Sequence, residues 1–370
     1  MPQSRSAFLV IVLLAVWSTG ITPDAAAHEL ELTEVHLSFS NDGSFQVDVM
    51  NDPGWLLMRV EPFSGLGLSG RLEPARRDDR LVEMEETFAE RVHLYFDGVR
   101  VDARARYRPP TDVGPAAPDG TRLGVMRLDG QVPPGALTFS FAYGLIMDPY
   151  PILIRNRENE VVTYWNVGEY ETEVFSLDEL TPPTRWEVVQ TYLWLGFTHI
   201  VPKGLDHILF VVGIFLLSVR VWPLLAQVTS FTVAHTLTLG LTMFGVVALP
   251  PTLVEPLIAL SIAYVGIENV MTSELRRWRL GLVFGFGLLH GMGFAGVLRE
   301  LGLPTGEFVP ALMSFNIGVE GGQLLVIAIL GLVLGWTRRQ HWYRRVVVIP
   351  LSLVIAAIGL YWTVTRAAAG

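Results

Sequence analysis

The sequence predicts a two-part protein, in which an N-terminal all-β sandwich domain precedes a polytopic α-helical membrane domain of about six transmembrane helices. The chain of 370 residues is 51% hydrophobic and only 17% charged. Such a balance is too apolar for an ordinary soluble protein and too polar for a membrane bundle alone. The first half alternates apolar and polar residues, whereas the second half contains long apolar runs. We therefore expect two regions that face different solvents.

Charge and cysteine content exclude several classes of function. The net charge of −9 argues against a nucleic-acid partner, because phosphates demand a basic surface. There are no cysteines, so neither disulfides nor thiolate metal sites can form. Any metal must be bound through nitrogen and oxygen, which favours nickel, cobalt, zinc or divalent copper.

Residues 1–27 have the pattern of a secretory signal peptide. Arg5 precedes an apolar core at Ala7–Trp17, and Ala25–Ala27 form a small-residue cleavage site. An uncleaved anchor helix is the alternative, but the apolar core is short for one. We expect cleavage before His28 and a periplasmic location for the domain that follows, next to a bacterial inner membrane.

Residues 28–180 are expected to form the β domain, and Leu177–Arg185 the linker that follows it. Five segments show the period of two that is typical of half-buried strands. They are Glu31–Phe39, Ser44–Met50, Arg91–Phe96, Val99–Tyr107 and Ala136–Tyr143. Turns are predicted between them at Asn41–Gly43, Asp97-Gly98, Asp129-Gly130 and Pro133–Gly135. His93 is expected to be an ordinary surface residue of a strand.

Residues 186–370 are expected to form the membrane domain. Its six apolar spans are 205–219, 224–247, 253–271, 279–297, 309–335 and 345–364. The first span is long enough only with a helical run-in from residue 189. Alternatively, Val188–Ile200 is an interfacial or re-entrant helix that breaks at Pro202–Gly204. Arginines concentrate in the first, third and fifth loops, which predicts that these loops are cytoplasmic.

Six ionisable residues in this apolar half are the strongest functional feature. Carboxylates and imidazoles are costly inside a bilayer and persist there mainly where they bind, relay or conduct something. Five of the eight histidines lie beyond residue 198. We predict one shared metal site, and its expected ligands are His199, Asp206, His207, His235, His290 and Glu320.

Several neighbouring residues are expected to support this site. Asn316 shares a helix face with Glu320, and hydroxyl groups near His235 could orient its ring. An acidic residue at each end of the third span suggests ion entry and exit, although Glu268 pairing with Arg276 or Arg277 is an equal alternative. Glycines of the fourth span allow close helix packing and would place His290 deep in the bundle. The supporting residues are Asn316, Glu255, Glu268, Asn269, Gln323 and Thr232.

A second metal site could form at the mature N-terminus. If the signal is removed before His28, that residue combines a free α-amino group with an imidazole, and the two nitrogens can chelate a transition metal. His36 lies an even number of residues away and therefore on the same face of a regular strand. The alternative is that His28 follows the cleavage site by chance.

The membrane half resembles the HupE/UreJ family of bacterial membrane proteins, in particular its branch with an N-terminal extracytoplasmic domain. The resemblance covers roughly residues 190–365. The stretches that carry it are Gly204–Phe210, Phe231–Leu239, Glu255–Asn269, Phe284–Ala295 and Phe315–Gln323. The resemblance implies that His199, Asp206 and His207 correspond to the family's first-helix histidine and Asp-His signature.

The family's known role sets the expected function. Its members are regarded as nickel or cobalt permeases associated with hydrogenase and urease maturation. The resemblance thus implies a non-enzymatic transporter in the lipid bilayer, with nickel or cobalt as substrate ahead of copper or zinc. An extracytoplasmic metal donor or a metalloenzyme-maturation partner would fit this role.

Two other functions stay open. One is a membrane redox protein with b-type haem held between histidines. The other is a metal-dependent assembly or sensor protein whose β domain binds a partner. The absence of a His-Glu-x-x-His motif argues against a metalloprotease of that class.

Overall fold

The computed structural model of the chain describes residues 33–70, 72–111, 114–115, 122–146, 149–158, 160–167, 170–218, 220–247, 249–274, 276–300 and 306–369. Its contacts divide into two compact units. The β unit is Leu30–Thr191 with Val297–Phe308, and the helical unit includes Tyr192–Gly296 and Val309–Gly370. The predicted signal peptide and His28 lie outside the described residues.

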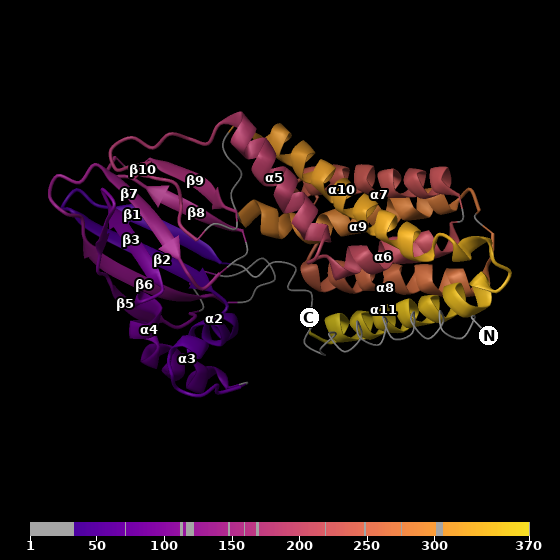
Figure 1. The fold of residues 1–370 in the computed structure, drawn as a ribbon, viewed down its shortest axis with the longest axis horizontal. Coiled ribbons are helices and arrows are strands. Elements are labelled where there is room, and N and C mark those ends of the chain that lie inside the picture. The colour runs from indigo at the N-terminus through magenta and orange to yellow at the C-terminus, as the bar shows by residue number, and fades with distance from the viewer. Residues whose placement is uncertain are drawn as a thin grey trace. The chain divides into compact units, whose positions relative to one another are not determined.

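The β unit contains two sheets, as Figure 1 shows. The six-stranded sheet has the order β5-β6-β2-β1-β8-β9, and the four-stranded sheet the order β10-β7-β3-β4. In chain order the strands are β1 (Glu34–Phe39), β2 (Ser44–Asn51), β3 (Val92–Phe96), β4 (Val99–Val101), β5 (Arg104–Arg108), β6 (Gly124–Gln131), β7 (Thr138–Tyr143), β8 (Tyr150–Arg155), β9 (Val161–Asn166) and β10 (Phe175–Ser176). Most pairs are antiparallel, but β1 and β8 are parallel.

One hydrophobic core joins the two sheets into a sandwich. Alternate residues of β1 are buried, as the period of two predicted. The ring of Phe39 in β1 lies 4.6 Å from that of Phe139 in β7 and 6.3 Å from that of Phe96 in β3 (centroid distances). Because β1 belongs to one sheet and β3 and β7 to the other, these contacts close the core between the sheets. The predicted β-sheet character of this region is confirmed.

Two local predictions in the β unit are wrong. The single strand expected at Val99–Tyr107 is divided, because β4 belongs to the smaller sheet and β5 to the larger. The turn expected at Asp129-Gly130 is part of strand β6. Gly130 is needed there for packing, since a Cβ atom would collide with the ring of Phe45 on the neighbouring strand β2.

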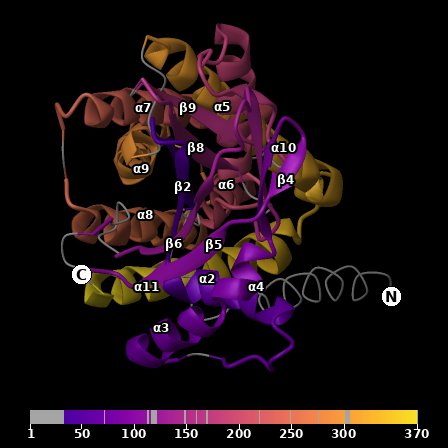
Figure 2. The same ribbon diagram turned by 90° about the vertical axis from the view of Figure 1, so that its left-hand side faces the viewer.

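Three helices in the β unit were not predicted. They are α2 (Pro53–Val60), α3 (Pro74–Glu83) and α4 (Glu85–Ala89), which lie together beside β5 (Figure 2). Helix α2 has a clear local cause, because the Asp52 carboxylate accepts hydrogen bonds from the amides of Gly54 and Trp55, and Pro53 occupies the first turn. These helices are short, and the alternation of apolar and polar residues that predicts strands does not reveal them.

His93 is buried and not on the surface as predicted. It lies in β3 at 9% exposure. Burial, followed by the positive charge of Arg100, lowers the pKa of His93 below its ordinary value of 6.5.

The helical unit follows the predicted spans closely. The helices from residue 185 onward are α5 (Arg185–Ile200), α6 (Leu205–Leu217), α7 (Val221–Met243), α8 (Pro251–Met271), α9 (Arg279–Glu300), α10 (Phe308–Leu334) and α11 (Ile349–Ala369). A short 3-10 helix, η2 (Thr337–Arg339), and one turn of π-helix, η3 (Arg344–Val348), precede the last. Among the described residues, four helical segments are long and apolar enough to cross a membrane. They are Val221–Met243, Pro251–Met271, Phe308–Leu334 and Arg344–Ala368. The six predicted spans are thus matched by helices, whereas only these four meet that criterion singly.

The first predicted span is bent. Helices α5 and α6 meet at an angle of 68° across a short break, and the pair would count as a fifth span if it crosses as one. The break at residues 201–204 was predicted from Pro202 and Gly204. Gly204 is required at this bend because a Cβ atom would collide with the carbonyl oxygen of His199.

Helices α7 and α9 pack closely through glycines, as the sequence predicted. Cβ atoms at Gly287 and Gly291 would collide with the backbone of α7 at Phe231 and His235. This close approach brings the α9 turn that carries His290 against the α7 turn that carries His235.

Candidate metal centre

Four histidines from four helices converge inside the helical unit. His199 lies in the last turn of α5, His207 lies in the first turn of α6, and α7 and α9 contribute His235 and His290. Each is at most 2% exposed. The ring centroids of His199 and His207 are 4.8 Å apart, those of His207 and His290 are 5.0 Å apart, and those of His207 and His235 are 5.9 Å apart. His207 therefore occupies the centre of the cluster.

Three of these imidazoles are close enough to share one ion. His199, His207 and His235 each offer a ring nitrogen, and these three atoms lie within 4.8 Å of one another. An ion about 2.0–2.1 Å from each nitrogen would hold its ligands roughly 3 to 4 Å apart. Small side-chain rotations would close that difference. His290 lies outside this group of three but stacks edge-on against His207.

The protonation of His235 is fixed by α10. The Nδ1 atom of His235 lies 3.0 Å from Oδ1 of Asn316, and the amide of Asn316 donates to the carbonyl of Leu312 at 2.8 Å. That second bond turns the amide oxygen toward the imidazole, so Nδ1–H of His235 donates to it. The lone pair is then on Nε2, which has no hydrogen-bond partner among the described residues. Such an arrangement is typical of a metal-ligating histidine.

His290 is oriented in the same way by a backbone carbonyl. Its Nδ1 lies 2.8 Å from the carbonyl oxygen of Phe286, which can only accept a hydrogen bond. Nδ1 is therefore the protonated nitrogen and Nε2 carries the lone pair. This Nε2 is also buried without a partner in the part of the chain that the structure describes.

His207 lies among aromatic rings and makes no hydrogen bond through either ring nitrogen to any described residue. The ring of Phe231 is 5.7 Å from that of His207 and 4.9 Å from that of His290, and Phe210 is 5.4 Å from His290. A buried polar atom normally has a partner, and each exception calls for an explanation. Binding of a ligand by these nitrogens would explain why they lack a partner.

Helix α10 supports the histidines through α7. Besides Asn316, Gln323 accepts a hydrogen bond from the hydroxyl of Thr232 at 3.1 Å, and Glu320 accepts one from Thr229 at 2.6 Å. Of these predicted supporting residues, Asn316 contacts a histidine directly, whereas Thr232 and Gln323 join α7 to α10 by bonding to each other. The carboxylate of Glu320 contacts α7 and does not belong to the group of three histidines.

The structure pairs Asp206 with an arginine and leaves it out of the group of three histidines. Neighbouring helical residues point about 100° apart, and while His207 faces the cluster, Asp206 forms a buried bidentate ion pair with Arg366 of α11, at 2.7 and 3.0 Å. The sequence prediction missed Arg366 because the last span was expected to end at residue 364. A lone arginine at the end of an apolar helix was the available signal.

The other predicted positions are distributed along α8 and β1. Glu268 pairs with Arg279 at 3.1 Å and not with Arg276 or Arg277. Asn269 donates to the carbonyl of Gly213 at 2.8 Å and accepts from Arg279, so it joins α8 to α6 and α9. The carbonyl of Glu255 accepts a hydrogen bond from Arg366 at 3.4 Å.

The predicted N-terminal metal site is described only in part. His36 lies in β1 of the β unit, where its Nε2 is 2.6 Å from the carboxylate of Glu34. Its proposed partner, His28, is outside the described residues, so this site stays a prediction.

Comparison with known families identifies the helical half. Residues 176–366, more than half of the chain, match the family described as HupE / UreJ protein. No curated protein and no solved structure matches the chain. The matched region contains the four buried histidines, their supporting residues on α10 and the Asp206–Arg366 pair. The chain belongs to the HupE / UreJ family.

Proposed function

We propose that this protein is an integral membrane permease for a divalent transition metal, nickel or cobalt. The observation that carries the proposal is the group of buried imidazole nitrogens within 4.8 Å of one another. The membership in the HupE / UreJ family and the apolar helices support it. The two ring nitrogens of His207 are buried without a hydrogen-bond partner among the described residues, and such a desolvated imidazole is expensive unless it binds something.

The ligand chemistry favours a borderline transition metal. Neutral imidazole suits nickel, cobalt, copper and zinc, whereas magnesium and calcium prefer oxygen. Asp206, a buried carboxylate next to His207 in the sequence, is neutralised by Arg366. The ligand set is therefore mainly nitrogen, with His199, His207 and His235 as ligands and His290 as a fourth nitrogen close to His207.

Transport also requires that the ion can leave. A site for conduction binds tightly enough to admit the ion and weakly enough to release it. The cluster spans a bend between α5 and α6, so a change of that angle would alter the distance between His199 and His207. We propose that Glu320, Glu255 and Glu268 lie along the path of the ion, and that Asn316, Thr232, Gln323 and Asn269 hold its walls.

The proposed membrane orientation is supported by the distribution of charge. Arg220, Arg276 and Arg277 lie in loops that would be cytoplasmic under the positive-inside rule. We therefore propose an inner-membrane protein whose β unit is periplasmic. There the β unit would receive metal from an extracytoplasmic donor or deliver it to a partner in metalloenzyme maturation.

Uptake by purified full-length protein in liposomes tests the proposal. Nickel, cobalt, copper and zinc would be offered separately, with and without a proton gradient. We expect accumulation of nickel or cobalt by the wild type and at least about a tenfold loss in His235→Ala, which removes a proposed ligand together with its hydrogen bond to Asn316. His341→Ala is the matched control, because His341 is exposed and outside the cluster.

Two results would contradict transport. One is absence of flux for all four ions from folded, correctly inserted protein. The other is uptake that His235→Ala and His341→Ala leave equally intact. A visible absorption spectrum of the same preparation tests the haem alternative, because b-type haem has a strong band that a nickel or cobalt site lacks.

A further inference from the structure

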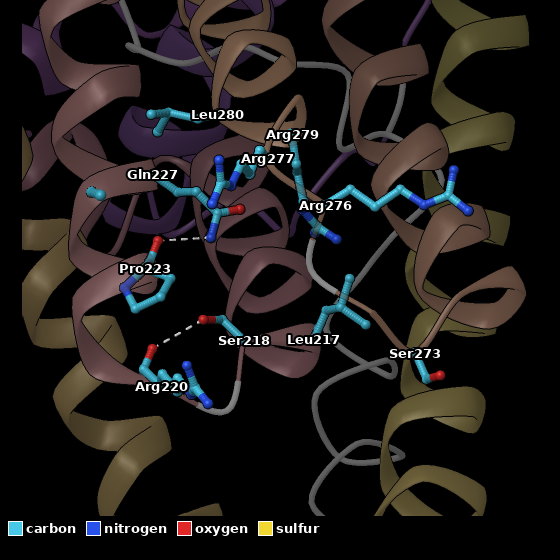
Figure 3. A pocket seen from close by; sticks show the side chains of 11 residues that line it. Leu217, Ser218, Arg220, Pro223, Gln227, Ser273, Arg276, Arg277, Arg279 and Leu280 are labelled. Atoms are coloured by element: carbon cyan, nitrogen blue, oxygen red, sulfur yellow. Dashed lines mark hydrogen bonds between the residues drawn. The ribbon is translucent and has the colours of Figure 1, made fainter.

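We propose that the helical unit contains a second site, which binds the phosphate group of an anionic ligand. A cavity of about 750 Å³ lies where α6 and α8 end and α7 and α9 begin (Figure 3). Its charged lining residues are Arg220, Arg276, Arg277 and Arg279, and no acidic side chain is among its described lining residues. This cavity is distinct from the histidine cluster, because none of the histidines lines it.

The side chains of three of the four arginines have no protein partner in the described residues. Arg220, Arg276 and Arg277 are exposed, and their side chains form no ion pair or hydrogen bond there. Figure 3 shows Arg276 and Arg277 on the α9 side of the cavity and Arg220 on the α7 side. Like charges that line one cavity repel one another, and an anion bound there would offset that repulsion.

The arginines of the cavity do not cap the neighbouring helices, because two other arginines bind the carbonyl groups at the ends of α6 and α8. Arg338 donates to the carbonyl of Phe215 at 3.1 Å, near the end of α6. Arg344 donates to the carbonyls of Asn269 and Thr272, at the end of α8, at 3.1 and 2.8 Å. The C-terminal ends of α6 and α8 are thus already occupied.

A buried side chain and the first backbone amides of α7 give the cavity further hydrogen-bond donors. Arg279 is 1% exposed, and while its terminal nitrogens pair with Glu268 and Asn269, its Nε has no hydrogen-bond partner among the described residues. Helix α7 begins at Val221, and its N-cap residue Arg220 makes no capping hydrogen bond through its side chain. An uncapped helix N-terminus favours an anion through its free amides and its dipole.

Phosphate is the anion that this combination fits best. Guanidinium groups match phosphate oxygens in bidentate geometry, and several can share one doubly charged group. Two sources could supply it, namely a phospholipid headgroup and free phosphate. Leu217, Ala226 and Leu280 give the cavity an apolar side. Basic pockets between helices at the cytoplasmic side of a membrane are typical headgroup sites.

Exposed tryptophans favour the lipid source. Trp222 is 82% exposed at the start of α7, and Trp278 is 48% exposed just before α9. Tryptophan is enriched at the level of lipid headgroups. The cavity would then lie at that level, where phosphate groups are abundant.

Binding to the full-length protein in metal-free buffer tests this inference independently of metal transport. Detergent-solubilised protein would be titrated with fluorescent phosphatidic acid and, in a second arm, dialysed against labelled inorganic phosphate. We expect Arg276→Gln/Arg277→Gln to weaken binding by about tenfold or more. Arg339→Gln/Arg345→Gln removes the same charge from exposed arginines outside the cavity and should change binding by no more than about twofold.

A variant without a charge change separates a shaped site from diffuse attraction. Ala226 lines the cavity, and Ala226→Phe would fill part of it. Loss of phosphatidic acid binding in this variant supports a headgroup site, while saturable phosphate binding without lipid binding supports the same site with free phosphate as its source. Equal losses in the two arginine double variants, or no binding of either probe by the wild type, would overturn the proposal.

Discussion

The contact between His235 and Asn316 decides which ring nitrogen of His235 is free to bind metal. Replacing Asn316 with Ala removes the acceptor that holds Nδ1–H, so the ring can rotate or change its tautomer. Loss of such a supporting group typically costs 10- to 100-fold in metal affinity. We expect nickel binding to Asn316→Ala, measured by isothermal titration calorimetry, to weaken within that range.

Ser314→Ala is a suitable comparison, because Ser314 is also buried on α10 and lies outside the cluster. Equal affinity of Asn316→Ala and the wild type would show that the amide does not orient the imidazole.

The pair of Asp206 and Arg366 is expected to stabilise the bundle mainly by mutual neutralisation. Removing either charge leaves the other buried and unpaired, which typically costs about 3–5 kcal/mol. Asp206→Asn and Arg366→Gln should each lower the melting temperature strongly. The double variant should be much less destabilised than the sum of the two.

Thermal unfolding of the four proteins in one detergent measures this coupling. Additive effects of the two substitutions would contradict a direct ion pair. If Asp206 is instead a metal ligand, added nickel should raise the melting temperature of Arg366→Gln more than that of the wild type.

His93 gives the β unit a pH dependence whose direction is fixed. Its lowered pKa means that, as the pH falls through about 6.5, the unfolded chain takes up a proton that the folded chain does not. The free energy of unfolding should therefore decrease below that pH, and this residue should contribute no slope well above it. Melting temperatures of full-length wild type and His93→Gln from pH 8 to pH 5 measure the difference. Identical slopes for the two proteins would contradict the assignment.

At the scale of helices, the packing of α9 on α7 depends on Gly291. A Cβ atom there would collide with the carbonyl oxygen of His235 and with Thr238. Gly291→Ala should therefore separate the two helices, at a cost of about 1–3 kcal/mol, and weaken nickel binding by moving His290. Gly285→Ala, on the same helix but with open space around it, should do neither. Melting temperature and nickel titration of both variants test this, and similar behaviour of the two would count against the close contact.

Helices and strands could be predicted from the sequence where their hydrophobic pattern is long. The long apolar helices were predicted to within a few residues, as was the break near Pro202, because hydrophobic length and proline act locally. Helices α2 to α4 are short, and a period of two does not reveal them, although Asp52 and Pro53 are a local start signal for α2. The division of Val99–Tyr107 between two sheets depends on tertiary pairing, which a period of two cannot show.

For the candidate site, the sequence indicated which polar residues are buried in the helical unit but not which partners they contact. The histidines and the supporting Asn316 were identified from the cost of burying polar groups. Asp206 was grouped with them because it precedes His207, but its partner Arg366 lies 160 positions later in the chain. Contacts between such distant segments depend on helix packing and could not be predicted from spacing.

For the whole molecule, the buried histidines are the feature that best fits the family's association with metal transport. The helical unit would carry the ion, and the cavity lined by arginines would bind a phosphate group at one end of the same bundle. The β unit has its own core and its own sheets. It would act outside the membrane, where a partner or metal donor could reach it.

X-ray absorption of the nickel-loaded full-length protein tests the central claim most directly. We predict a spectrum with several imidazole nitrogens as ligands, fewer in His207→Ala, and no change in His341→Ala. Nickel bound through oxygen alone, or an imidazole signal that His207→Ala leaves unchanged, would contradict the assignment of the buried histidine cluster as the metal site.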